Sequence, residues 1–204
     1  MTEVFGLYLV ITDPVAGYAA CAVAAVEQGV RYLQLRMKAA PRNEMVRVGH
    51  ELRAITRSTS TRFIVNDDLE VARAVDADGL HLGQTDLSIA EARRRWPNSE
   101  SKLFGLSTHN ELQAVEALRQ APDYIGVGPV YPTPTKLNAD PVIGIERAAA
   151  IILGSKLNCV AIGGIDRARL SELRQAGIAN YAVVRYVCQH PRPREAISQL
   201  MSGA

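Results

Sequence analysis

The stretch Tyr-Ile-Gly-Val-Gly-Pro-Val-Tyr-Pro-Thr-Pro-Thr-Lys, residues 124–136, contains a junction that recurs along this chain: an apolar segment followed by a polar loop. Residues 124–127 are short and apolar, which is typical of a buried strand. The three prolines that follow predict a loop, because proline has no N–H for a strand ladder or a helix. This loop presents Thr133, Thr135 and Lys136, two hydroxyls and an ammonium that suit a phosphorylated ligand; an ordinary proline-rich surface turn is the alternative.

Length and composition limit the class of protein. The chain of 204 residues fits one domain over residues 1–204, and its 48% hydrophobic and 22% charged residues are typical of a globular protein. A net charge of +2 is too small to indicate a nucleic-acid partner. Three cysteines without metal-binding spacing, and no apolar signal before the first predicted strand, predict a cytoplasmic protein with no membrane partner. A homo-oligomer remains open.

The junction between an apolar segment and a polar loop occurs eight times. Strands are predicted at residues 6–12, 32–38, 63–66, 79–82, 103–107, 124–127, 159–162 and 181–184, and helices at residues 19–28, 43–56, 69–75, 88–96, 110–119, 145–153, 167–176 and 194–201. Strict alternation predicts a parallel sheet covered by helices. Eight units favour a single (β/α)₈ TIM barrel over a doubly wound open sheet, since no Gly-x-Gly-x-x-Gly follows the first strand. Functional residues are then expected at the carboxyl ends of the strands.

Polar residues occur near the end of the second predicted strand. Gln34, Arg36 and Lys38 alternate with Leu35 and Met37, so the three polar side chains are expected to face the barrel interior. Buried cations need anionic partners. The two cations therefore predict either an anionic ligand or acidic residues on neighbouring strands.

Carboxylates follow the third and fourth predicted strands. The third predicted strand ends in Asn66, Asp67 and Asp68, and Asp86 follows the fourth. Neighbouring strands therefore bring carboxylates to the same rim of the barrel. Asp67 and Asp86 are candidate ligands of Mg²⁺, which takes one or two protein carboxylates together with water and substrate phosphate. Asp at such a boundary is also a common helix cap, the role we predict for Asp68.

The fifth predicted strand closes with hydroxyl and imidazole groups. Asn110 or Thr108 is expected to cap the next helix, which leaves Ser107 and His109 as site candidates. His109 is either a proton-transfer group or a residue with a structural role that is held by hydrogen bonds. His81, between two leucines, is expected to face the barrel interior with its ring nitrogens hydrogen-bonded to protein groups.

The last two strands end with a candidate phosphate site. Gly163 and Gly164 follow the seventh strand, where glycine allows close backbone approach to an anion. Val184 and Arg185 end the eighth. The loops after strands seven and eight are the common phosphate site of such barrels.

Six motifs in this order resemble the thiamine phosphate synthase family: Gln-Leu-Arg-x-Lys at 34–38, Asn-Asp at 66–67, Gly-x-His-Leu-Gly-Gln-x-Asp at 79–86, Gly-Leu-Ser-Thr-His at 105–109, Gly-Pro-Val-Tyr-Pro-Thr-Pro-Thr-Lys at 128–136 and Ile-Gly-Gly-Ile at 162–165. The resemblance implies a small (β/α)₈ barrel that joins hydroxymethylpyrimidine diphosphate to thiazole phosphate and releases pyrophosphate. It assigns the pyrimidine diphosphate to Gln34, Arg36, Lys38, Asn66, Ser107 and Lys136, with Arg36, Lys38, Lys136 and Ser107 catalytic. It assigns Mg²⁺ to Asp67 and Asp86, and thiazole phosphate to Thr133, Thr135, Gly163, Val184 and Arg185.

Three positions depart from the family pattern. Met37 stands where Glu is usual, Asp68 where Arg is common, and Arg185 where Ser usually follows Val. Arg185 either substitutes for the hydroxyl in phosphate binding or reshapes the pocket. The alternative functions are a thiazole tautomerase of the same barrel family, with His109 as the proton-transfer group, and a non-catalytic regulator that binds thiazole or thiamine phosphate.

Overall fold

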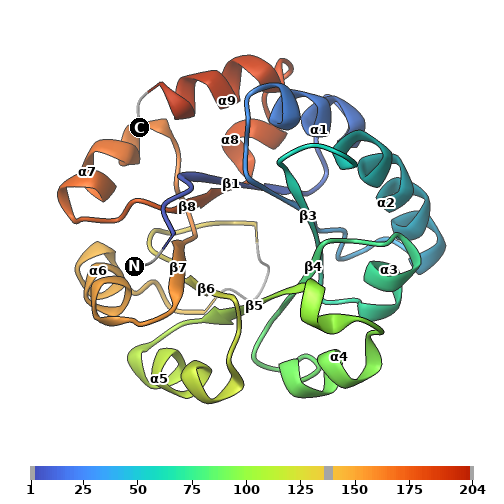
Figure 1. Cartoon of the computed structure of the whole chain (residues 1–204). Coiled ribbons are helices and arrows are strands. Elements are labelled where there is room, and N and C mark those ends of the chain that lie inside the picture. Colours follow the sequence, from blue (N-terminus) through green and yellow to red (C-terminus); the bar gives the residue numbers. More distant parts are fainter. Residues whose placement is uncertain (1–2, 136–139, 203–204) are drawn as a thin grey trace.

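The computed structural model describes residues 3–135 and 140–202 and forms a closed parallel barrel (Figure 1). Each strand pairs with the next in sequence order, and the last pairs with the first. The strands are β1 Leu7–Ile11, β2 Tyr32–Leu35, β3 Arg62–Asn66, β4 Gly79–Leu82, β5 Leu103–Thr108, β6 Tyr124–Val127, β7 Asn158–Ala161 and β8 Tyr181–Val183. The predicted (β/α)₈ barrel is confirmed.

Helices cover the outside of the barrel on all sides (Figure 1). They are α1 Tyr18–Glu27, α2 Arg42–Thr56, α3 Leu69–Ala74, α4 Ile89–Arg95, α5 Glu111–Gln120, α6 Ile145–Gly154, α7 Leu170–Gln175, α8 Arg185–Cys188 and α9 Pro193–Met201, with short 3₁₀ turns η1 Ser99–Ser101 and η2 Arg167–Arg169. Helix α8 was not predicted, because four residues are too few to show a helical period.

Alternating strand residues face two separate cores. In β1, Leu7 and Leu9 pack against the helices, whereas Tyr8 and Val10 point into the barrel interior. Small residues such as Ala22 on α1 are fully buried and let the helices approach the sheet closely. Both faces of each strand are therefore covered, which explains why the strands read as continuous apolar runs.

Several predicted strand boundaries were wrong by one residue, and two larger differences affect the site. Strand β2 ends at Leu35 rather than residue 38, because β1 ends at Ile11, whose carbonyl accepts the last bond from the Arg36 N–H at 3.0 Å. Conversely, the ladder continues past the first proline after β6. The N–H of Val130 donates to Ile162 O at 2.9 Å, and that of Tyr131 to Gly163 O at 3.0 Å, since both residues lie between prolines and keep their donors.

Helix termini follow the predicted chemistry. The Asp68 carboxylate accepts a bond from Val71 N at 3.0 Å and caps α3, and Asn110 accepts one from Gln113 N at 2.9 Å and caps α5. Gly29 follows the end of α1 with φ of 70°, the left-handed conformation that suits glycine after a helix. The predicted caps of α3 and α5 are confirmed.

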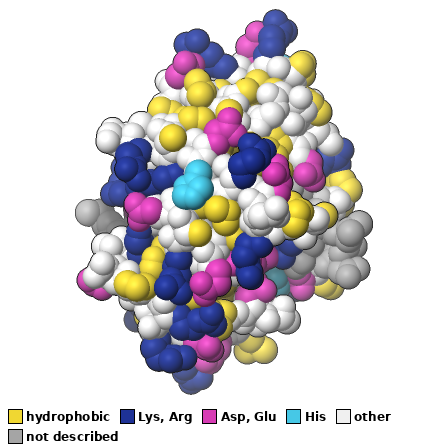
Figure 2. Space-filling model, turned by 90° about the vertical axis from the view of Figure 1, so that its right-hand side faces the viewer, with side chains coloured by type: hydrophobic (Ala, Val, Ile, Leu, Met, Phe, Trp, Pro, Cys, Tyr) yellow, Lys and Arg dark blue, Asp and Glu magenta, His cyan; other side chains and the backbone are white. Residues whose placement is uncertain are grey.

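The surface carries charges of both signs. Figure 2 shows lysine and arginine interspersed with aspartate and glutamate over the face turned to the viewer, with no broad area of one sign. The three cysteines are free and buried. No described helix has the length and apolar character needed to cross a membrane.

Candidate active site

A cavity of about 960 Å³ opens at the carboxyl ends of the strands. Its lining includes every predicted site residue that the structure describes: Gln34, Arg36, Lys38, Asn66, Asp67, Asp86, Ser107, Thr133, Thr135, Gly163, Val184 and Arg185. Lys136, the remaining candidate, lies outside the described residues. The barrel therefore brings together side chains up to about 150 positions apart in the sequence.

The floor of the cavity is a chain of hydrogen bonds across the barrel interior. Gln34 Nε2 donates to the Tyr8 hydroxyl at 2.9 Å, and the hydroxyls of Tyr8 and Tyr124 lie 2.8 Å apart. His81 continues the chain, with Nδ1 at 3.1 Å from the Tyr124 hydroxyl and Nε2 at 2.9 Å from Ser107 Oγ. Five strands thus contribute one polar group each to a single connected floor.

Burial keeps this floor uncharged. It lowers the pKa of His81 to about 4, and it raises the pKa of Tyr8 and of Tyr124. All three side chains are therefore neutral near pH 7. Neutral hydroxyl and imidazole groups can each donate or accept, which suits a polar but uncharged ring of a ligand.

Three residues of this floor, Tyr8, His81 and Tyr124, line the cavity, which was not predicted from the sequence. His81 was expected to be a satisfied interior histidine, and its two hydrogen bonds confirm that, but it also lines the cavity. Tyr8 and Tyr124 were counted only as strand residues. The signal was present, because period-two alternation along β1 and β6 places both tyrosines on the interior face that also carries Gln34.

Carboxylates and a lysine gather at one side of the mouth. The side chains of Asp67 and Asp86 lie within hydrogen-bonding reach of each other, and the Lys38 ammonium contacts Asp67 Oδ2. Asp86 Oδ2 also accepts a bond from Gly83 N at 2.7 Å. Burial raises the pKa of Asp67, and Asp86 adds to the rise while Lys38 opposes it. Two adjacent carboxylates in a partly desolvated place favour a positive partner.

This donor set fits a magnesium ion. Among the described residues no group of three or more His, Cys, Asp or Glu side chains could hold a metal. Mg²⁺ does not need such a cage, since it keeps several waters and takes one or two carboxylates with substrate phosphate oxygens. Asp67 and Asp86 are the residues that would hold it.

Arg36 lies in the same region, and no described side chain is its partner. Its side chain is half-buried, and burial lowers the pKa of the guanidinium although Asp67 and Asp13 partly offset this. Within the described part of the chain, the guanidinium makes neither a hydrogen bond nor an ion pair. A partly desolvated cation without a partner indicates that the site is built for an anion.

The opposite side of the mouth presents backbone amides. The N–H groups of residues 163–166 donate to no acceptor in the part of the chain that the structure describes. Gly163 and Gly164 have φ of 104° and 65°, and a Cβ on either would lie 2.6 Å from the β6–α6 loop, at Pro129 Cα or Pro132 O. Both positions therefore need glycine. The free amides next to η2 form a concave donor set suited to a phosphate.

Hydroxyls and one more cation lie near these amides. Thr133 Oγ1 and Thr135 Oγ1 are 3.1 Å apart on the β6–α6 loop and line the cavity. Arg185 begins α8 directly after β8, is exposed, and donates from one guanidinium nitrogen to Gln189 Oε1 at 3.1 Å. No acidic partner for Arg185 lies among the described residues, and its guanidinium remains available at the mouth.

His109 has both ring nitrogens engaged. Nδ1 lies 2.6 Å from the carbonyl oxygen of Gly128, and Nε2 lies 3.2 Å from Asp140 Oδ2. The His109 N–H donates to Gln113 Oε1 at 2.7 Å. Of the two roles considered for His109, this geometry favours the structural, hydrogen-bonded role over proton transfer.

Comparison with known proteins agrees with this geometry. The family model described as "Thiamine monophosphate synthase" matches residues 7–187. The chain belongs to the thiamine monophosphate synthase family. Relatives named "Thiamine-phosphate synthase" include one from Chloroflexus aurantiacus, 43% identical over 164 residues that make up 80% of this chain and 74% of the relative. Another, from Synechocystis sp., is 40% identical over 96% of this chain.

Solved structures place this family member in the same fold. "Thiamine phosphate pyrophosphorylase from Pyrococcus furiosus" superimposes with a TM-score of 0.86 at 33% identity, covering 98% of this chain and 95% of that one. The curated relatives are not all of this length: the chain spans 56% of the Synechocystis protein.

Two of the departures from the family pattern, Met37 and Asp68, do not line the cavity. Met37 packs against the core between sheet and helices, as predicted from its outward position. Asp68 caps α3 and pairs with Arg42 at 2.8 Å. Only the third departure, Arg185, lines the cavity.

Proposed function

We propose that the chain is a thiamine-phosphate synthase that condenses hydroxymethylpyrimidine diphosphate with thiazole phosphate. One observation supports this above the others: cations with carboxylates line one side of the cavity, backbone amides with threonine hydroxyls line another, and an uncharged polar floor lies between them. Arg36, Lys38 and the two aspartates come from β2, β3 and β4, whereas the free amides and the threonine hydroxyls come from β6 and β7, at different places around the ring (Figure 1). Two phosphorylated substrates can therefore meet over one floor.

The proposed reaction is a dissociative alkyl transfer. The bond between the pyrimidine methylene carbon and the diphosphate oxygen breaks, and its electron pair leaves with pyrophosphate. The lone pair of the thiazole nitrogen then attacks the resulting pyrimidine methyl cation and forms the new C–N bond. No protein nucleophile is required, in agreement with a site made of cations, carboxylates and amides.

Each group has a role in this scheme. Arg36 and Lys38 stabilise the charge that develops on departing pyrophosphate, with Lys136 assigned to the same task from its motif. Gln34, Asn66 and Ser107 bind and orient the pyrimidine ring above the floor. When bound, a magnesium ion held by Asp67 and Asp86 would neutralise diphosphate charge as a Lewis acid.

The thiazole phosphate is assigned to the other side of the cavity. Thr133, Thr135 and the Gly163 amide would bind its phosphate, next to the Val184–Arg185 end of β8. Since Arg185 stands where a serine is usual, a guanidinium takes the place of a hydroxyl at this point.

The geometry disfavours the alternative functions. A thiazole tautomerase needs a histidine free to move a proton, and both nitrogens of His109 face protein acceptors. A non-catalytic phosphate-binding regulator does not need an arginine such as Arg36, which has no ion-pair partner among residues 3–135 and 140–202, beside two carboxylates.

Pyrophosphate release tests the proposal directly. The protein is supplied with both substrates and Mg²⁺, and pyrophosphate and thiamine phosphate are quantified together. We expect equal amounts of the two products, and no pyrophosphate when thiazole phosphate is omitted. Isomerisation of a thiazole without pyrophosphate would favour the tautomerase instead, and binding without turnover would favour the regulator.

A further inference from the structure

The β6–α6 loop is fixed at both of its ends by one side chain. Between Val127 and Ile145 the chain carries Thr133 and Thr135 on the cavity wall. The His109 ring lies between Gly128, at the start of this loop, and Asp140, on its return. Among the described residues, no other side chain joins both ends of the loop by hydrogen bonds or ion pairs.

The two partners of the His109 ring determine what kind of hydrogen bond it makes to Asp140. A carbonyl oxygen and a carboxylate can only accept, so the ring makes both bonds only when each nitrogen carries a proton. The contact to Asp140 is then a charge-assisted bond between side chains that are only 18% and 34% exposed. Such a bond is stronger than a fully exposed ion pair.

We propose that His109 is a positioning residue, which ties the start and the return of the β6–α6 loop together and so holds Thr133 and Thr135 against the ligand phosphate. Other contacts fix the first part of the loop: Val130 and Tyr131 bond to the chain after β7, and the Tyr131 hydroxyl donates to Glu172 at 2.8 Å. The return is held by Ile143 N, which donates to Pro129 O at 2.9 Å, and by Asp140. Loss of the His109 contact therefore loosens the return, and with it Thr133 and Thr135, while Val130 and Tyr131 stay in place.

Removal of this contact should affect the binding of one substrate more than that of the other. The identity of that substrate, thiazole phosphate, rests on the proposed function. A looser loop presents its hydroxyls in more arrangements, and the entropy of ordering them is then lost on binding. Most residues assigned to the pyrimidine diphosphate come from other elements: Gln34, Arg36, Lys38, Asn66 and Ser107 belong to or follow β2, β3 and β5, and among the described residues they make no hydrogen bond or ion pair with residues 140–144. Only Lys136, of the residues assigned to that substrate, belongs to this loop.

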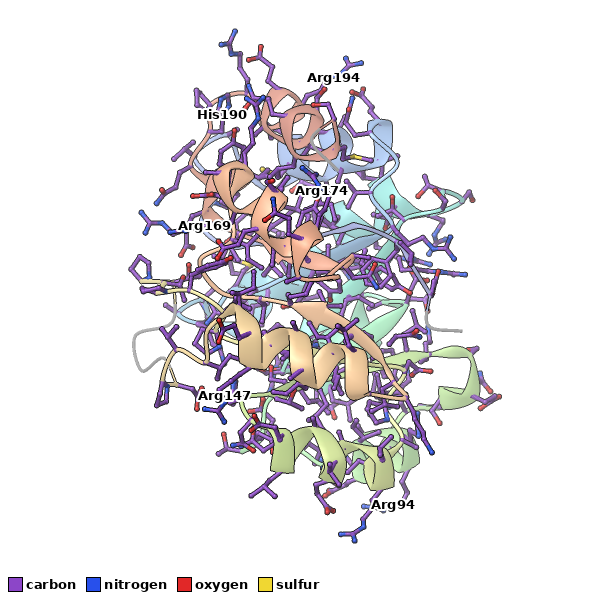
Figure 3. The ribbon with its side chains drawn as sticks, turned by 90° about the vertical axis from the view of Figure 1, so that its left-hand side faces the viewer. Arg94, Arg147, Arg169, Arg174, His190 and Arg194 are labelled. Carbon is purple, nitrogen blue, oxygen red and sulfur yellow. The ribbon has the colours of Figure 1, made fainter. Side chains whose placement is uncertain are left out.

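Two substitutions separate the partners. His109→Asn keeps a donor near the Nδ1 position for Gly128 O but does not reach Asp140, and Asp140→Asn keeps an acceptor without its charge. The matched control is Glu111→Gln, because Glu111 accepts two bonds from Arg147 at 3.1 and 2.8 Å and so links α5 to α6 without touching the loop. Arg147 lies between these two helices in Figure 3.

Steady-state kinetics and amide hydrogen exchange are measured on all three variants and on the double variant. In His109→Asn and Asp140→Asn we expect the KM for thiazole phosphate to rise about tenfold, and the KM for pyrimidine diphosphate to rise less, because only Lys136 of the residues assigned to that substrate belongs to the loop. Exchange of the Ile143 amide should become about tenfold faster. The double variant should be no worse than the more affected single variant, because the two residues share one contact. Glu111→Gln should match wild type in both measurements.

The proposal is overturned if both single variants keep the wild-type KM and exchange rate. It is also overturned if kcat falls, both KM values rise by the same factor and the melting temperature drops. That outcome would indicate a purely structural role. The two proposals fail in different ways. A wild-type protein that releases no pyrophosphate contradicts the proposed function, whereas the exchange of Ile143 reports on the His109 contact whatever the substrate is.

Discussion

The ring of Tyr124 occupies the space that a side chain at position 105 would fill. Gly105 pairs in register with both His81 and Tyr124, and a Cβ on it would lie 2.2 Å from Tyr124 Cζ and 2.4 Å from His81 Nδ1. The missing side chain is what lets the imidazole and the phenol meet across β5. The polar floor of the cavity therefore depends on a glycine.

Gly105→Ala should destabilise the protein by about 1–3 kcal/mol, because the added methyl group forces both rings from their positions. Urea denaturation measures the change. Gly126→Ala is the matched control, since a Cβ there meets His81 Cε1 at 3.5 Å, an ordinary contact. Equal loss of stability in the two variants would contradict this account of the floor.

The buried neutrality of His81 predicts how stability depends on pH. Its pKa in the folded protein is about 4, below the ordinary value of 6.5. The unfolded chain therefore takes up a proton first, and stability is lost as pH falls from about 6.5 to about 4. A difference of this size corresponds to about 3 kcal/mol.

His81→Gln removes this proton uptake. The variant should be less stable than wild type at pH 7.5, because two buried hydrogen bonds change, and the difference should shrink as pH approaches 4. Urea denaturation at several pH values measures it. A difference that stays constant with pH would show that His81 does not titrate in this way.

Asp67→Asn and Asp86→Asn should each lower turnover by orders of magnitude and weaken its dependence on Mg²⁺, since each removes one of two carboxylates that would hold the ion. Asn is preferred to Ala at position 67, where φ is 62° and asparagine is better tolerated. Activity is measured against Mg²⁺ concentration. Asp68→Asn is the control, because asparagine also caps a helix; wild-type rates at low Mg²⁺ in both test variants would exclude the metal assignment.

Arg36→Ala should slow the chemical step more than it weakens thiazole phosphate binding, because contacts to the leaving diphosphate strengthen as it gains charge. Single-turnover kinetics separate the two effects. A raised KM for thiazole phosphate with an unchanged single-turnover rate would indicate that Arg36 binds thiazole phosphate rather than the pyrimidine diphosphate.

Arg185→Ala should raise the Kd for thiazole phosphate about ten- to a hundredfold, since a hydrogen bond to a charged group contributes roughly 1.5–3 kcal/mol. Arg185→Ser should recover part of this loss through the hydroxyl that is usual at this position. Isothermal titration calorimetry measures both variants. Arg174→Ala, on the outer helix α7 (Figure 3), is the charge-matched control, and a change of less than about threefold in Arg185→Ala would leave the phosphate to the backbone amides.

The architecture was predictable from the sequence because it depends on local periodicity. Eight apolar segments alternating with helical ones admit few arrangements other than a closed barrel, and strands β4 and β6 begin and end at the predicted residues. The described candidate residues line one cavity for the same reason, since parallel strands all end at one rim. The predictions failed where a boundary depended on a neighbour, as at Leu35, where β1 gives no further partner.

Tertiary structure alone decided the partners of these side chains. The sequence places His81 within one apolar strand and His109 directly after another, but it does not name their partners. The His81 ring meets two hydroxyls in a buried floor, and the His109 ring meets two acceptors on another loop. Local periodicity fixes the direction of a side chain within its own strand. Contacts between loops depend on how strands distant in sequence are brought side by side when the barrel closes, and no short stretch of sequence carries that information.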